Sequence, residues 1–111
     1  MEIKTIVDKD VYIFELKGNL LGEVDGKPMM MECTKALNAD CSKLIFNLEH
    51  LKFINSTGLG SILTLVNKSN EKKVKIFFTN LPAQLSKLIA ITKLESILIS
   101  TDTVESALAM N

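Results

Sequence analysis

A short run of hydroxyl residues and glycines, Asn55-Ser56-Thr57-Gly58-Leu59-Gly60, is the part of this sequence best suited to chemistry. It follows an apolar, strand-like run and precedes a helical pattern, so its backbone amides would begin a helix and lack partners within that helix. Free amides, together with the helix dipole, favour a negative group at such a place. A phosphate on Ser56 would add about two negative charges there.

The same residues do not form the commoner phosphate-binding or hydrolytic motifs. The Gly-Lys-Ser/Thr end of a P-loop does not follow. A hydrolase elbow needs a glycine two residues before the serine, where this chain has Ile54. The only histidine, His50, has no evident acidic partner, and we interpret it as an exposed loop residue. We therefore predict that the chain is not an enzyme, with a small serine hydrolase as the weakest hypothesis. The structural alternative is that Ser56 and Thr57 occupy the cap of the helix and that the glycines allow close packing of the helix on the sheet.

Composition limits the partners and the compartment. The 111 residues include 13 basic and 13 acidic side chains, so we do not expect nucleic acid as a partner. The balanced charge gives little repulsion between copies, and we expect a monomer or weak homodimer. Neither Cys33 nor Cys41 has metal-ligand spacing, so we expect buried thiols, no metal site and no cofactor. The apolar runs are shorter than a signal peptide or a membrane span, which predicts a cytoplasmic protein without direct membrane insertion.

The elements before the motif begin with a β-hairpin. Residues 3–7 and 11–16 are β-rich and are separated by a tight turn. We interpret residues 18–26 as a loop that carries three glycines. Pro28 then suits the first turn of a helix, and Asp25 is the candidate cap of that helix.

The rest of the chain alternates between strand and helix patterns. Residues 43–48 form an apolar run typical of a buried strand, and residues 51–54 lead from it to the motif. Apolar residues at helical spacing predict a helix over 59–66, which the polar stretch 67–73 would end. The remaining expected elements are a strand at 74–78, a helix carrying Leu85, Leu88 and Ile89, a strand within 94–99, and a helix at 104–110 capped from 101–103.

This alternation favours parallel strands joined by right-handed crossovers. We predict one α/β domain over residues 1–111, with a mixed sheet of four or five strands, about four helices, and the hairpin strand at an antiparallel edge. Ligands and partners of open α/β sheets usually meet the loops after the carboxyl ends of parallel strands. Ser56 is expected at one of those ends.

The stretch from Phe53 to Gly60 closely resembles the signature of the STAS domain of bacterial anti-sigma factor antagonists. The usual form of that signature is Asp-Ser-Ser/Thr-Gly-Leu-Gly after a strand. The resemblance extends over nearly the whole chain. It includes Gly18-Asn19-Leu20 after the second strand and Ile91-Thr92-Lys93-Leu94 at the end of the late helix.

The resemblance implies a STAS-like fold and a binding function. Such a protein binds an anti-sigma factor that is also a serine kinase, and so frees a sigma factor. The kinase would phosphorylate Ser56 to end the binding, and a serine phosphatase would reset the cycle. Thr57 would be a capping neighbour, and the two glycines would allow close approach of the kinase. The partner-binding residues implied in this way are Asn55, Ser56, Thr57, Gly58, Leu59, Gly60, Asn19, Leu21 and Glu23.

Two positions depart from the family pattern. Asn55 stands where the signature has Asp, and Leu21 stands where the family often has an acidic residue used in partner contact. Glu23 or Asp25 could substitute for that acidic residue. Asn55 favours an alternative function, in which the chain is a STAS subunit of a membrane-transporter ATPase complex and is not phosphorylated.

Overall fold

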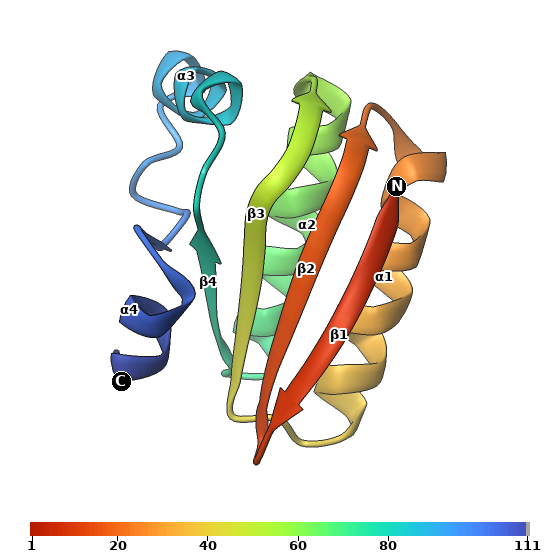
Figure 1. The fold of residues 1–111 in the computed structure, drawn as a ribbon, viewed down its shortest axis with the longest axis vertical. Coiled ribbons are helices and arrows are strands. Elements are labelled where there is room, and N and C mark those ends of the chain that lie inside the picture. The colour runs from red at the N-terminus through yellow and green to blue at the C-terminus, as the bar shows by residue number, and fades with distance from the viewer. Residues whose placement is uncertain (111) are drawn as a thin grey trace.

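Five strands form one mixed sheet in the computed structural model, which describes residues 1–110 (Figure 1). The order of the strands in the sheet is their order along the chain. The first two strands pair antiparallel as a hairpin, and all later neighbours are parallel. The strands are β1 (Glu2–Asp8), β2 (Val11–Leu20), β3 (Lys43–Ile54), β4 (Lys75–Thr79) and β5 (Ser100–Thr101). This arrangement confirms the predicted α/β class and the antiparallel edge hairpin.

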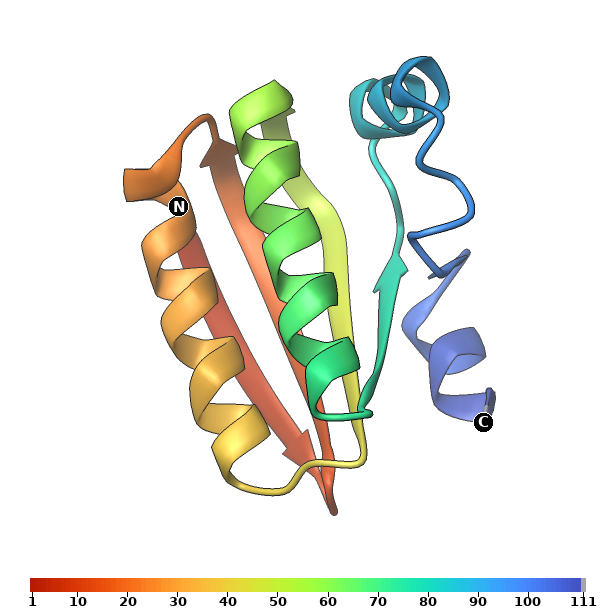
Figure 2. The same cartoon turned by 180° about the vertical axis from the view of Figure 1, so that it is seen from behind.

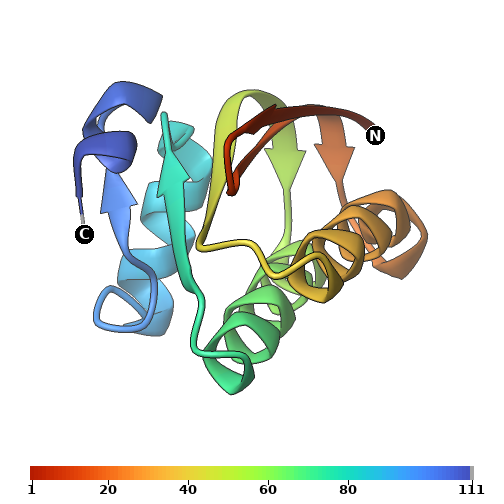
Figure 3. The ribbon, with the colours of Figure 1, turned by 90° about the horizontal axis from the view of Figure 1, so that it is seen from below.

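Four helices cover the sheet in the described part of the chain. The long helices α1 (Glu23–Asn38) and α2 (Ser56–Glu71) lie side by side across one face (Figure 2). Helix α3 (Ala83–Thr92) contributes to the core on that same face, whereas α4 (Val104–Ala109) packs on the other face (Figure 3). Every predicted helix is therefore present, although several of the boundaries differ.

Side chains that alternate along the strands form two cores. Phe14, Phe46 and Phe78 occupy matching positions on three neighbouring strands, and each is at most 2% exposed. The ring centroids lie 4.8 Å apart for the first pair and 5.6 Å apart for the second. These rings face α1 and α2, because alternate residues of a strand share a face. The residues one position earlier belong to the smaller core under α4: Ile13, Ile45 and Phe77.

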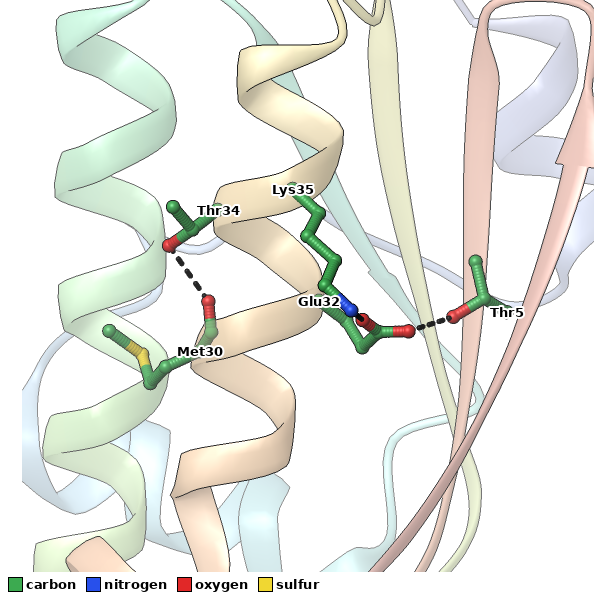
Figure 4. A network of polar contacts seen from close by, with 5 residues as sticks. All are labelled: Thr5, Met30, Glu32, Thr34 and Lys35. Carbon is green, nitrogen blue, oxygen red and sulfur yellow. Dashed lines mark hydrogen bonds and ion pairs between the residues drawn. The ribbon is translucent and has the colours of Figure 1, made fainter.

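Polar contacts join α1 to the edge strand β1 (Figure 4). Thr5 Oγ1 donates a hydrogen bond to Glu32 Oε1 at 3.2 Å, and Lys35 Nζ lies 3.2 Å from the other carboxylate oxygen. Thr34 Oγ1 donates to the Met30 carbonyl within the helix. Exposed pairs of this kind contribute at most about 1 kcal/mol. The buried apolar face of α1 therefore provides most of its attachment to the sheet. The polar contacts orient the helix over the hairpin.

Lys43, the first residue of β3, attaches α4 to the sheet. Its Nζ donates to the carbonyl oxygens of Ala107 at 2.9 Å and Leu108 at 3.2 Å, and also to that of Met110. These carbonyls lie at the end of α4, where the helix dipole favours a positive charge. The other end of β3 leads to Ser56, so α4 is attached at the end of β3 remote from the motif.

The segment 18–26 is not the loop that we predicted. Strand β2 continues to Leu20 and α1 begins at Glu23, which leaves only two connecting residues. Gly26 lies inside α1, where an added Cβ would be 3.1 Å from Ser61 Oγ on α2. This glycine therefore serves the close packing of two helices, and its presence does not indicate a loop.

The early start of α1 also changes the places of Asp25 and Pro28. The cap position is Gly22, so Asp25 is the third helical residue and not the cap. Pro28 lies within the helix, beyond the first turn that we predicted for it. A polar residue before a proline resembled a helix start, but the residues that precede both are already helical.

Strand β3 is one strand of 12 residues and not a strand at 43–48 followed by a separate approach at 51–54. Its register with β2 shifts, since Glu15 pairs with Asn47 but Lys17 pairs with His50. Such irregularities interrupt the alternation of buried and exposed residues. His50 is exposed, as predicted, but it belongs to this strand and not to a loop.

The ends of α2 and the position of the last strand also differ from prediction. Helix α2 continues through most of the polar stretch to Glu71, and Ser69 within that stretch is fully buried. The last strand is Ser100–Thr101 and does not lie within 94–99. Leu94 and Leu98 in that segment pack against the main core, Leu98 being buried. Their apolar character therefore reflects packing and not a strand.

The buried row of Phe14, Phe46 and Phe78 gives a stability test. We expect Phe46→Ala to lower the free energy of unfolding by about 3–5 kcal/mol, because a buried ring is removed from a packed core. Phe53→Ala, on the same strand, should change it by less than about 1 kcal/mol, because that ring is 57% exposed. Urea unfolding followed by circular dichroism measures both. Equal losses for the two variants would contradict the assignment of the core.

The two cysteines are free and buried, as predicted. Cys33 is 0% exposed and Cys41 is 5% exposed. Burial raises the pKa of the Cys33 thiol to about 11 and also raises the pKa of the Cys41 thiol. Both groups are therefore held as neutral thiols at physiological pH.

Alkaline pH should weaken the fold through these thiols. The unfolded chain releases a thiol proton from about pH 9, whereas folded Cys33 keeps its proton until about pH 11. This contribution leaves stability unchanged below about pH 9 and lowers it as the pH rises from there to about 11. Urea unfolding across that range measures the free energy of unfolding at each pH. In Cys33→Ala this free energy should fall less steeply as the pH rises. Thiols that react with a disulfide reagent in the native protein would contradict the burial.

Candidate functional site

Asn55 is the cap of α2. Its backbone is extended, and its Oδ1 accepts a hydrogen bond from the Gly58 N–H at 2.9 Å. Its Nδ2 donates to the carbonyl oxygen of Leu21 at 2.8 Å. Ser56 and Thr57 are therefore the first two helical residues, and the prediction that they occupy the cap was wrong. Asparagine is itself a strong capping residue, and it precedes them.

The two glycines of the motif have different roles. A Cβ at Gly58 would lie 2.1 Å from the carbonyl oxygen of Leu20 and 3.0 Å from Ile54 Cγ1, so only glycine fits there. A Cβ at Gly60 would meet nothing within 4 Å. Gly58 thus supports the structural interpretation of close helix–sheet packing. Gly60 leaves an open surface on the first turns of α2.

The hydroxyl groups of the motif lie at the surface. Ser56 and Thr57 are exposed, whereas Gly58 and Leu59 are buried. Among residues 1–110, Ser56 Oγ has no hydrogen-bond partner, and the first turn of α2 holds no acidic residue. A phosphate on Ser56 would therefore lie at a helix N-terminus, where backbone amides and the helix dipole favour it and no carboxylate of that turn opposes it.

The structure brings the end of β2 against the motif. Asn19 pairs with Phe53 in parallel register, and Leu21 is hydrogen-bonded to Asn55. Glu23 is the first residue of α1 and is exposed. Asn19 and Leu21 are exposed as well, so all three residues from the β2–α1 region are available to a partner at the carboxyl edge of the sheet.

Sequence reasoning missed two side-chain hydrogen bonds that support this edge. Gln84 of α3 accepts a hydrogen bond from the Ile54 N–H at 3.1 Å, just before the cap of α2. Asp25 Oδ2 accepts one from the Leu21 N–H at 3.0 Å. No local pattern links Gln84 to a residue 30 positions away. The spacing of four between Leu21 and Asp25 was available, but it carried no meaning while the segment was interpreted as a loop.

A metal site, a membrane span and a serine hydrolase site each need features that residues 1–110 do not show. No group of three or more His, Cys, Asp or Glu side chains is placed to hold a metal ion. None of the helices there has both the length and the apolarity to cross a membrane. His50 Nε2 lies 4.0 Å from Glu49 Oε2, and no hydrogen bond joins His50 to Ser56. The pairing of nucleophile and base that a serine hydrolase needs is therefore not formed in this structure.

The fold and the motif together define a small α/β domain, in which an exposed serine begins a helix at the carboxyl edge of a mixed sheet. The chain belongs to the STAS domain family, because the model of that family matches residues 2–107. The resemblance seen in the signature residues is thereby confirmed over nearly the whole chain. No curated protein sequence gives a significant match.

Solved structures share this fold at low sequence identity. An anti-sigma factor antagonist from Mycobacterium paratuberculosis is 15% identical with a TM-score of 0.80, over 96% of this chain and 90% of that one. The Bacillus cell fate determinant SpoIIAA in its phosphorylated form is 18% identical with a TM-score of 0.73, over 96% of each chain. The murine anion transporter Slc26a9 is 15% identical with a TM-score of 0.70, over 89% of this chain and 17% of that one. The fold is thus shared by regulators and by a transporter.

The two glycines provide a matched pair of variants. We expect Gly58→Ala to destabilise the protein by at least about 2 kcal/mol, because the new Cβ would overlap the Leu20 carbonyl. Gly60→Ala should stabilise it by about 0.5–1 kcal/mol, because alanine favours a helix and the space is open. Thermal and urea unfolding of both variants check the signs. A tolerated alanine at position 58 would show that α2 does not need this close approach.

Proposed function

We propose that this chain is an anti-sigma factor antagonist. In this proposal it sequesters an anti-sigma factor that has serine kinase activity, and phosphorylation of Ser56 ends the binding. The observation that carries the proposal is the position of Ser56 in a STAS domain, where it is exposed, has a free hydroxyl and begins a helix of 16 residues. The similar protein SpoIIAA, an anti-sigma factor antagonist, has been solved in both unphosphorylated and phosphorylated forms.

The surface beside Ser56 explains how a phosphate would end binding. Leu21 and Phe53 near the motif are 44% and 57% exposed, so part of this edge is apolar. A partner that covers such a surface removes it from water. A phosphate introduced there adds about two charges that the interface must desolvate, which disrupts binding. The same phosphate is tolerated in the free chain by the helix N-terminus.

The reaction makes few demands on this chain. The kinase transfers the γ-phosphoryl group of ATP to Ser56 Oγ, the hydroxyl proton leaves, and ADP is released. A serine phosphatase then hydrolyses the phosphoserine. The chain supplies only the acceptor and the binding surface, so it needs no catalytic group or cofactor of its own. We place this cycle in the cytoplasm, with residues 1–111 acting as one domain.

Phosphorylation can be tested directly. Incubation with ATP and a serine-kinase anti-sigma factor encoded near this chain should add one phosphate, as measured by intact-mass spectrometry. Ser56→Ala should abolish the addition, because it removes the acceptor oxygen. Thr57→Ala is the matched control, since it deletes the neighbouring exposed hydroxyl and should leave the phosphate in place. A phosphate that persists in Ser56→Ala would place the acceptor elsewhere.

Asn55 supports a second candidate function, that of an unphosphorylated subunit of a membrane-transporter ATPase complex. Its amide caps α2 without placing a carboxylate beside Ser56. Affinity purification separates the two proposals. Recovery of a transporter ATPase, with Ser56 unmodified in the presence of every co-encoded serine kinase, would favour this second function over the switch.

A further inference from the structure

Leu21, one of the two residues that connect β2 to α1, is held at both of its backbone polar groups. Its N–H donates to Asp25 Oδ2 at 3.0 Å, and its carbonyl oxygen accepts from Asn55 Nδ2 at 2.8 Å. Asp25 belongs to α1 and Asn55 caps α2, so side chains from two different elements fix one connecting residue. Surface connections are usually more mobile than the elements they join. The connection at Leu21 is instead held by one hydrogen bond from each of these two elements.

The fastened residue presents an apolar side chain to solvent. Leu21 is 44% exposed and is not part of either core. Two further apolar side chains lie at the same edge of the sheet, Val24 at 85% exposed in the first turn of α1 and Phe53 at 57% exposed near the end of β3. This pair of backbone hydrogen bonds, the Leu21 clamp, therefore adds nothing to the core. It fixes the backbone from which the Leu21 side chain projects, so a partner has less of this connection to immobilise on binding.

We propose that Asn55 and Asp25 are positioning residues that present Leu21, beside Ser56, as an apolar specificity contact for the partner protein. This inference rests on the proposed function, and the partner is the serine kinase that phosphorylates Ser56. The fitting surface on that kinase is an apolar recess for Leu21 next to the site that receives the Ser56 hydroxyl. The recess need not carry a cation, because Leu21 offers it no charge.

The chemistry of Asn55 carries this inference. The carboxamide accepts from Gly58 with its oxygen and donates to Leu21 with its nitrogen at the same time. A carboxylate can only accept, so aspartate at this position could cap α2 but could not hold the Leu21 carbonyl. Asparagine is therefore the residue that combines the cap of α2 with the clamp.

The clamp can be measured without any partner. Asp25→Ala should raise the hydrogen-exchange rate of the Leu21 amide by about threefold or more, because its acceptor is lost. Asp25→Asn should preserve the slow rate, since the amide oxygen still accepts. Glu23→Ala removes the same charge from the same turn and is the matched control. Glu23→Ala should exchange like the wild type. If Asp25→Ala also exchanges at the wild-type rate, the hydrogen bond from the Leu21 N–H does not restrain the connection and the clamp does not exist.

The role in recognition requires the kinase. Leu21→Ala should raise the dissociation constant of the complex with the kinase by about tenfold, as truncation of a buried anchor does. Asp25→Ala and Asn55→Asp should also weaken binding in the wild-type background. In the Leu21→Ala background they should change it by less than about twofold, because they act through the side chain that is already missing. Calorimetric titration gives each constant, and melting temperatures verify that the variants remain folded.

The outcomes separate this inference from the proposed function. A kinase that phosphorylates Ser56 and binds Leu21→Ala as tightly as the wild type overturns the inference alone. Effects of Asp25→Ala that persist in full on the Leu21→Ala background overturn it as well, because the carboxylate then acts by another route. A chain that no kinase binds or phosphorylates overturns the proposed function and, with it, the recognition role of Leu21.

Discussion

Helix α2 begins against the end of β2 at a distance that only glycine allows. The Leu20 carbonyl occupies the place where a side chain at Gly58 would start, and the cap residue Asn55 reaches from the same turn to the next carbonyl along the chain. The motif is therefore not an appendage on a finished fold. The hydroxyl groups of the motif face outward because Gly58 and Leu59 are buried beneath them. Exposure of Ser56 and packing of α2 are two results of one constraint.

The parts of the fold that depend on periodicity could be predicted from the sequence. Phe14, Phe46 and Phe78 each lie in an alternating or continuous apolar run, and such runs indicate strands whether or not their partners are known. Alternation of these runs with helical patterns then restricted the topology to parallel crossovers. Those features are local or follow from general rules of chain connection, so no knowledge of distant contacts was needed.

The errors arose where a residue serves a contact that is distant in the sequence. Gly26 resembled a loop residue because the side chain that requires it, that of Ser61, lies on another helix. Leu98 resembled a strand residue because it fills the core from a turn. At the candidate site the proposed phosphoacceptor, Ser56, was identified from the signature. Gln84 could not be identified in this way, because its bond to Ile54 exists only once α3 is folded over the end of β3.

The attachment of α4 by Lys43 has a consequence for the order in which the molecule assembles. A helix of six residues is too short to be stable alone, and the core beneath α4 consists of a few side chains supplied by three different strands. The Lys43 ammonium group, which donates hydrogen bonds to the last carbonyl oxygens of α4, lies on β3, between β2 and β4. Helix α4 can therefore become stable only after the central strands have paired. It should be the last element to form and the first to open, while the edge that carries Ser56, at the other end of β3, stays intact.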